Sequence, residues 1–233
     1  MPSPTSPPEP EQPTAADPSE TAARSAVKDR FDDLPARDRY RLLTALVTPR
    51  PIALVTTRSG NGTDNAAPIS FFQVLAEEPP IVALSFNLRS DGTLKDTPLA
   101  IAETGEFVVN LVDEGLVAAM TICAAEFPPG ESEIPASGLT LLPCTGVTPG
   151  RIAEAPASLG CRTHTVIDLS PERRIVLGQV VSLQAKDALF TPDGRHLRDG
   201  AFLPVGRLYG DLYARTGDRF AVPRVTVEEA RGR

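Results

Sequence analysis

The segment RTHTVIDLSPERRIVLGQVVSL, residues 162–183, decides the fold class. On both sides of its centre, apolar and polar side chains alternate with a period of two, which is typical of half-buried β-strands. The centre, Ser170–Pro171–Glu172–Arg173, carries serine and proline, which favour a turn. The segment therefore predicts a β-hairpin, and a hairpin pairs its two strands antiparallel.

More strands are predicted elsewhere in the chain. Residues 52–57, 81–86 and 106–112 have strand length, are rich in β-branched side chains and are bounded by glycine or proline. Another turn is predicted at Asp193–Gly194. Because the strands come in runs separated by turns and do not alternate strictly with helices, a parallel Rossmann-type sheet is disfavoured. The pattern predicts a mainly β protein, a closed antiparallel β-barrel with peripheral helices.

Three short helices are predicted at the periphery. Residues 38–47 have helical spacing that ends at Pro49, and this helix is expected to pack through one apolar face. That face consists of Tyr40, Leu43, Leu46 and Val47. A second helix is predicted to begin near Asp96 or Thr97, and a third to span residues 114–126.

Length and composition predict one compact domain between an N-terminal arm and a C-terminal tail. The chain has 233 residues, 41% of them hydrophobic and 23% charged, which is ordinary for a globular protein. Seven of the 24 prolines fall in the first 18 residues, so residues 1–30 are expected to form a disordered proline-rich arm. The barrel is expected to span residues 31–220, and residues 221–233 a C-terminal tail.

Several classes of function are disfavoured by composition. The net charge is −7 and lysine and arginine are scattered, so no nucleic-acid partner is expected. No apolar stretch is long enough for a membrane helix or has the form of a signal peptide, which predicts a cytoplasmic protein without a membrane partner. The two histidines, His164 and His196, are distant in sequence, so no metal site is expected.

The cysteines and the paired acids receive structural interpretations. Three cysteines lie far apart without a Cys-x-x-Cys motif and are interpreted as ordinary buried thiols: Cys123, Cys144 and Cys161. The alternative is a reactive Cys161 near His164. Paired carboxylates in loops, such as Glu131 with Glu133, are interpreted as solvated charge. The glycine-rich stretch SGNGTDN, residues 59–65, is interpreted as a hairpin loop, because Asn65 replaces the third glycine of a dinucleotide fingerprint.

The joint TLKDTP, residues 93–98, has the chemistry of a phosphate site. Asp96 or Thr97 is a suitable N-cap and proline suits the first turn, so the helix start presents unpaired N–H groups and partial positive charge. The ammonium of Lys95 and the hydroxyls of Thr93 and Thr97 add donors for a phosphate monoester. The alternative is a plain capped helix with an exposed lysine.

A second segment, NAAPISFF at residues 65–72, suits a flat ligand. Its small residues let a ligand approach the backbone, Pro68 leaves a strand edge without a donor, and the side chains of Asn65 and Ser70 offer polar contacts. The alternative is an ordinary strand edge followed by two core phenylalanines.

Five segments in order resemble one known family, the flavin reductase-like, FMN-binding split-barrel flavoproteins. They are TPRPIALVTT, NAAPISFF, PPIVALSF, KDTPLAIAETGEFVVNLV and GRLYGDLYAR, and the resemblance covers roughly residues 36–216. It implies a six-stranded antiparallel split barrel, a homodimer and FMN held near the subunit interface. Relatives often carry asparagine where Ala100 precedes Ile101, and the proline-rich arm lies outside the family pattern.

The resemblance also implies which residues bind the cofactor. The phosphate side corresponds to Lys95, Asp96 and Thr97, with Thr93 in the same joint. The flavin ring and ribityl chain are expected to be lined by three further groups: Arg50, Pro51 and Ile52; Asn65, Ala66, Ala67, Pro68, Ser70 and Phe71; and Ser85, Phe86 and Asn87.

The implied activity is that of an NAD(P)H-linked FMN oxidoreductase of flavin reductase type. Bound FMN accepts a hydride itself, so no side-chain nucleophile is required and no catalytic residue is assigned. NAD(P)H is expected as a transient donor, and the sequence leaves open which nicotinamide is used and what accepts the electrons. A non-catalytic flavin-binding or electron-transfer protein is the alternative, and a barrel that has lost flavin is a third.

Overall fold

The structure is a computed structural model that describes residues 31–89 and 91–232. The predicted proline-rich arm lies outside the described residues. The chain divides into an N-terminal unit that ends at Leu42 and a main unit that begins at Leu43. The main unit contains all the strands, so the predictions about the barrel concern this unit alone.

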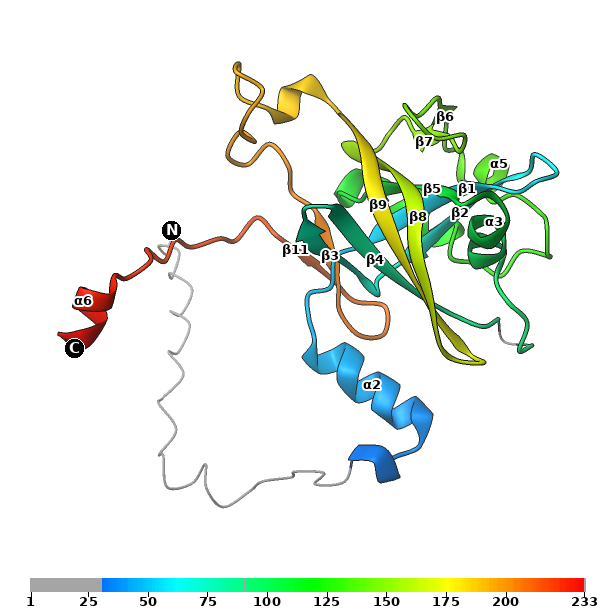
Figure 1. The fold of residues 1–233 in the computed structure, drawn as a ribbon, viewed down its shortest axis with the longest axis horizontal. Helices are drawn as coiled ribbons and strands as arrows, with labels where there is room; N and C mark the ends of the chain where they lie inside the picture. Colours follow the sequence, from blue (N-terminus) through cyan, green and yellow to red (C-terminus); the bar gives the residue numbers. More distant parts are fainter. Residues whose placement is uncertain (1–30, 90, 233) are drawn as a thin grey trace, which may run out of the picture. The chain divides into compact units, whose positions relative to one another are not determined.

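The main unit is built on a seven-stranded sheet (Figure 1). Its order is β2-β1-β5-β8-β9-β4-β3, and every neighbouring pair is antiparallel. The strands are β1 (Ala53–Arg58), β2 (Asp64–Ile69), β3 (Phe72–Glu77), β4 (Pro80–Asn87), β5 (Glu106–Leu111), β8 (Ala157–Ser170) and β9 (Arg173–Ala185). The predicted mainly β, antiparallel fold is confirmed.

The two edges of this sheet belong to one continuous stretch of chain. β2 and β3 are the edge strands, yet only Ser70 and Phe71 separate them in sequence. The N–H of Ser85 on β4 donates to the Phe71 carbonyl at 2.9 Å, which continues the β3–β4 pairing into the junction, and β2 also contacts β4. The sheet is therefore rolled toward closure at the junction, and it has seven strands where the resemblance implied six.

The remaining elements are helices and short strands. The helices are η1 (Phe31–Asp33), α2 (Ala36–Leu46), α3 (Asp96–Thr104), η2 (Glu114–Leu116), α4 (Val117–Ile122), α5 (Ile134–Ser137), η3 (Asp187–Leu189) and α6 (Val227–Arg231). The short strands form two pairs, β6 (Leu141–Leu142) with β7 (Arg151–Ile152) and β10 (Val205–Arg207) with β11 (Tyr213–Arg215). Within the described ranges, no helix is long and apolar enough to cross a membrane.

Three helix predictions need correction. The predicted apolar face of α2 is exposed, for example 49% at Leu43 and 78% at Leu46, so the face is not covered within the described chain. The helix predicted over residues 114–126 is a short 3-10 turn followed by α4, which ends at Ile122. The helix α3 begins at Asp96, as predicted, but its N-cap is Lys95, without a side-chain cap hydrogen bond, and not Asp96 or Thr97.

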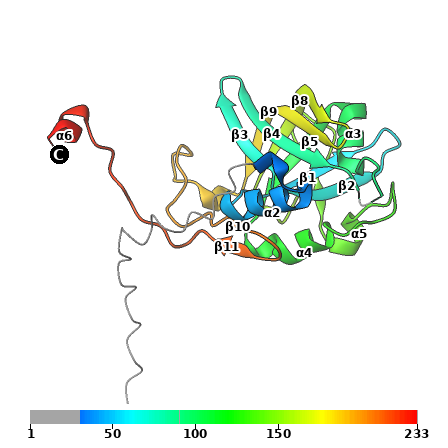
Figure 2. The same ribbon diagram turned by 90° about the horizontal axis from the view of Figure 1, so that it is seen from below.

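Buried apolar side chains form two clusters, and one fills the interior beneath β4, β5 and β9. Phe107 is fully buried there, and a Cβ on Gly178 of β9 would overlap its ring. The helix α3 contributes Ile101 to this cluster and packs on β1 and β2. Figure 2 shows α3 and the pair α4 and α5 flanking β2, which places the start of α3 beside this edge strand.

Candidate functional site

A cavity of about 200 Å³ lies between the start of α3, the edge strand β2 and the segment after α4. It brings together seven of the predicted site residues: Asn65, Ala67, Pro68, Phe86, Lys95, Asp96 and Thr97. Arg89, Glu133, Ile69 and residues 123–127 complete its lining. Two segments more than twenty residues apart in sequence, residues 65–68 and 95–97, therefore line the same cavity.

The helix start faces this cavity without a side-chain cap. The N-cap is Lys95, which is half-buried, and its backbone is extended with φ −71° and ψ 157°. Asp96 and Thr97 do not cap the helix because their side chains are hydrogen-bonded elsewhere, Asp96 to Arg89 and Thr97 to Asn65. The first N–H groups and the positive end of the helix are therefore left for an anion.

Arg89 is a functional candidate that the sequence reasoning missed. Its Nη2 donates to Asp96 Oδ2 at 2.6 Å and its Nη1 donates to the Phe127 carbonyl at 2.9 Å. The buried Nε atom has no hydrogen-bond partner within the described chain. The Arg89 N–H donates to the Thr93 carbonyl at 2.8 Å, and this hydrogen bond keeps Arg89 close to the start of α3. A lone arginine after a strand was the only signal in the sequence.

A chain of buried polar side chains crosses the floor of the cavity. The N–H of Ala66 donates to Glu133 Oε2 at 3.0 Å. With the amide nitrogen of Asn65 directed at Glu133, Nδ2 lies 3.0 and 3.1 Å from the carboxylate oxygens, and Oδ1 accepts from the Thr97 hydroxyl at 2.9 Å. Only 6% of Glu133, 7% of Asn65 and 2% of Thr97 is exposed.

The burial of Glu133 overturns its interpretation as solvated loop charge. Its neighbour Glu131 is exposed, as expected, but Glu133 turns into the cavity. Burial raises the pKa of the Glu133 carboxyl above its ordinary value, and the nearby Asp96 adds to the rise. The Ala66 N–H and the Arg89 charge oppose it. The site therefore holds a carboxyl whose proton is retained to a higher pH than that of an exposed glutamate.

Several other predicted residues lie outside this cavity lining. Arg50 is buried, and its guanidinium donates to the carbonyls of Thr44, Val47 and Leu208 at 2.6, 2.9 and 2.6 Å. The Thr93 hydroxyl is bonded to Asp91 at 2.7 Å on the surface. Pro51 is exposed, whereas Ile52 and Ala66 belong to the core. Ser70, Phe71 and Ser85 lie at or beside the β2–β3 junction.

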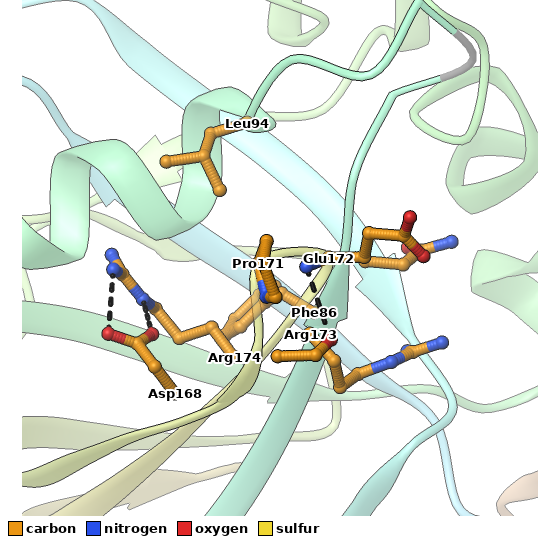
Figure 3. A pocket seen from close by; sticks show the side chains of 9 residues that line it. Phe86, Leu94, Asp168, Pro171, Glu172, Arg173 and Arg174 are labelled. Atoms are coloured by element: carbon orange, nitrogen blue, oxygen red, sulfur yellow. Dashed lines mark hydrogen bonds and ion pairs between the residues drawn. The ribbon is translucent and has the colours of Figure 1, made fainter.

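A second cavity, of about 240 Å³, shares Phe86 with the first (Figure 3). It lies between the end of β4 and the tip of the β8–β9 hairpin, and Asn87, another predicted residue, contributes to its lining. Arg174 is paired with Asp168 by two hydrogen bonds of 2.6 and 3.3 Å. Arg173 places its guanidinium 5.5 Å from the centroid of the Phe71 ring.

The cysteines are free and buried, as predicted. Burial raises the pKa of Cys161 to about 12, which disfavours the alternative of a reactive thiol there. Cys123 lines the first cavity, and burial raises its pKa as well. Among residues 31–89 and 91–232, no group of three or more histidine, cysteine, aspartate or glutamate side chains is placed to hold a metal ion.

Comparison with known proteins decides the family. The model of the flavin reductase-like domain matches residues 45–201, which include the whole of the first cavity. The chain belongs to the flavin reductase-like family. This family is FMN-binding, and its split-barrel fold is the fold of this chain, so the resemblance seen in sequence is confirmed.

Three relatives illustrate the range of this flavin reductase-like family. A protein of Halalkalibacterium halodurans, described as uncharacterized, is 40% identical over 205 residues, covering 86% of this chain and 97% of its own. The 2-nitrobenzoate 2-nitroreductase of Pseudomonas fluorescens is 36% identical, with a TM-score of 0.78 over 84% of this chain and 95% of that one. Nitrilotriacetate monooxygenase component B of Bacillus cereus is 32% identical, with a TM-score of 0.80 over 85% and 100%.

Proposed function

We propose that the first cavity binds FMN, with its phosphate at the start of α3. The observation that carries this proposal is an uncapped helix start that opens on a cavity lined by Lys95 and Arg89. Backbone N–H groups, an ammonium and a guanidinium are the donors that bind a phosphate monoester. The buried Arg89 Nε, which has no partner in the described part of the chain, fits the same ligand.

The other walls suit the remainder of the cofactor. Ala67 and Pro68 lie on the edge strand β2, where small side chains and the missing proline N–H leave room for a flat ring. Phe86 offers an apolar surface shared by the two cavities. The assignment of the predicted residues to ring, ribityl chain and phosphate remains a prediction.

The proposed activity is transfer of reducing equivalents from NAD(P)H through FMN to an acceptor. FMN supplies the hydride-accepting centre when bound. Lys95 and Arg89 would hold its phosphate, and Ala67 and Pro68 on β2 would line its ring. The second cavity supports the donor's approach, because it adjoins the first at Phe86 and presents Arg173 to a dinucleotide phosphate.

The relatives favour a reductive role over plain flavin storage. One is named as a nitroreductase and another as a component of a monooxygenase, and both are more than 30% identical to this chain. The runner-up is a non-catalytic flavin-binding or electron-transfer protein on the same fold, and a barrel without flavin is the third candidate. We also propose a homodimer, supported by exposed apolar side chains on α2 and on β3, such as Leu46 and Val74.

Anaerobic mixing of the FMN-loaded protein with NADH or NADPH tests the activity. We expect bleaching of the FMN absorbance near neutral pH, followed by turnover of added free flavin. FMN that stays oxidised with both donors in excess would leave the electron-transfer or binding role in place of the reductase. A purified protein that neither carries nor takes up FMN would favour the third candidate.

A further inference from the structure

Glu133 has no task in the proposed binding of FMN, although it lies in the floor of the cavity. It is the first member of a buried hydrogen-bonded chain that continues through Asn65 to Thr97. The three side chains come from the loop before α5, from β2 and from the first turn of α3. Thr97 lines the cavity at the proposed phosphate side, so the chain links a buried carboxyl to the ligand site.

The protonation state of the carboxyl fixes the direction of every hydrogen bond in this chain. An ionised carboxylate can only accept, so Asn65 must turn its Nδ2 to Glu133 and its Oδ1 to Thr97. The Thr97 hydroxyl then donates its single proton to Asn65, at 2.9 Å. Toward the cavity it offers only lone pairs, which face an anionic ligand unfavourably.

Protonation of Glu133 reverses these directions. The carboxyl O–H donates to Asn65 Oδ1, while its other oxygen still accepts from the Ala66 N–H. The amide nitrogen of Asn65 then faces Thr97 and donates to Oγ1, over the same 2.9 Å. The Thr97 proton is now free to donate into the cavity.

We propose that Glu133 is a positioning residue that sets the direction of hydrogen bonds along Glu133, Asn65 and Thr97, and thereby determines whether the Thr97 hydroxyl donates to the ligand's phosphate. The proposal rests on the proposed function only in placing a phosphate at Thr97. FMN binding is then coupled to protonation of Glu133. When Glu133 is protonated, the hydrogen-bonded side chains offer the phosphate one donor more than when it is ionised.

The charges around Glu133 determine the pH range in which this occurs. The groups that face it are Asp96 on α3, Arg89 after β4 and the Cys123 thiol at the end of α4. Burial raises the pKa of Glu133, so protonation persists above the range of an exposed glutamate. The contribution of Glu133 to FMN affinity is then fully present below that pKa and is lost as the pH rises through it. The charge of ionised Glu133 acts in the same direction, so the test must separate charge from hydrogen-bond direction.

Titrations of flavin fluorescence between about pH 5 and pH 9 make this separation. Glu133→Gln is neutral at all pH values, and its amide can donate to Asn65 while its oxygen accepts from Ala66. We expect its FMN affinity to follow only the titration of the FMN phosphate itself, whose second pKa is about 6. Relative to this variant, the wild type loses a factor of roughly 10 to 150 in FMN affinity at high pH, the worth of a hydrogen bond to a charged group. Glu131→Gln, at the exposed acid two residues earlier, follows the wild type.

Changes at Thr97 separate charge from direction. Thr97→Val keeps the charge of Glu133 but has no hydroxyl, so the additional pH dependence is reduced, and Thr97→Ser restores it. Equal pH dependence in the wild type and Thr97→Val would show that charge alone acts and would overturn the proposal. Riboflavin, which lacks the phosphate, shows little dependence on Glu133.

Failure of the two proposals can be told apart. A wild-type protein that does not bind FMN contradicts the proposed function itself. A wild type that binds FMN with the same pH profile as Glu133→Gln overturns the role of Glu133 alone. Circular dichroism checks that each variant is folded. If Glu133→Gln does not fold, the comparison of Thr97→Val with Thr97→Ser decides the question.

Discussion

Replacing Arg89 with methionine tests the phosphate side of the cavity. Methionine keeps an apolar stem but removes the guanidinium, which donates to Asp96 at 2.6 Å and to the Phe127 carbonyl at 2.9 Å. It also removes the buried Nε, the atom without a partner in the described chain that is proposed to face the ligand. The variant therefore loses an ion pair, a loop contact and a ligand contact together.

The expected magnitudes follow from the burial of this pair. The side chains of Arg89 and Asp96 are 12% and 20% exposed. Removing one partner of a buried pair costs about 3 to 5 kcal/mol, and an exposed pair contributes about 0 to 1 kcal/mol. We expect about 2 to 3 kcal/mol of lost stability for this mostly buried pair. Loss of a hydrogen bond to the phosphate weakens FMN binding by roughly 10- to 150-fold, and the unpaired Asp96 carboxylate adds repulsion.

The double variant Arg89→Met/Asp96→Asn separates the structural role from the ligand role. A neutral amide needs no cation, so stability in urea recovers in part, while FMN affinity in a fluorescence titration stays at least about 10-fold weaker than in the wild type. Arg215→Met is the control, because Arg215 pairs with exposed Glu114 away from the cavity, and it leaves FMN affinity unchanged. A double variant that binds FMN as tightly as the wild type would refute the ligand contact and leave Arg89 with its structural contacts to Asp96 and the Phe127 carbonyl.

Three further outcomes are expected. Lys95→Ala weakens FMN binding by roughly 10- to 150-fold in the same titration, and unchanged affinity removes Lys95 from the phosphate side. Arg173→Ala raises KM for the dinucleotide donor about fivefold with unaltered FMN affinity, because a half-exposed contact to phosphate contributes about 1 kcal/mol; an unchanged KM excludes this donor contact. The wild type is a homodimer by light scattering and Leu46→Glu/Val47→Glu shifts it to monomer, whereas a monomeric wild type contradicts the dimer.

The strands were predictable because their signals lie in adjacent residues. Alternation on both sides of residues 170–173 predicted the β8–β9 hairpin, and β-branched runs predicted β1, β4 and β5. The apolar face of α2 was interpreted wrongly because helical spacing shows which residues share a face but not whether the same chain covers it. The predicted cap at α3 was also wrong, since Asp96 and Thr97 take tertiary partners in preference to their own helix.

Glu133 shows why half of the site was beyond sequence reasoning. Its loop is polar, and an acid two residues after another acid is usually solvated. Its burial depends on donors supplied from β2, the Ala66 N–H and the Asn65 amide, and Ala66 lies 67 positions away in sequence. The nearest local signal is apolar: Ile134 packs against the core and Leu139 is buried in it, so the loop is anchored on both sides of α5. Because Glu133 directly precedes Ile134, it lies in the interior beside it. Its burial is tolerated because the edge strand β2 provides its hydrogen bonds.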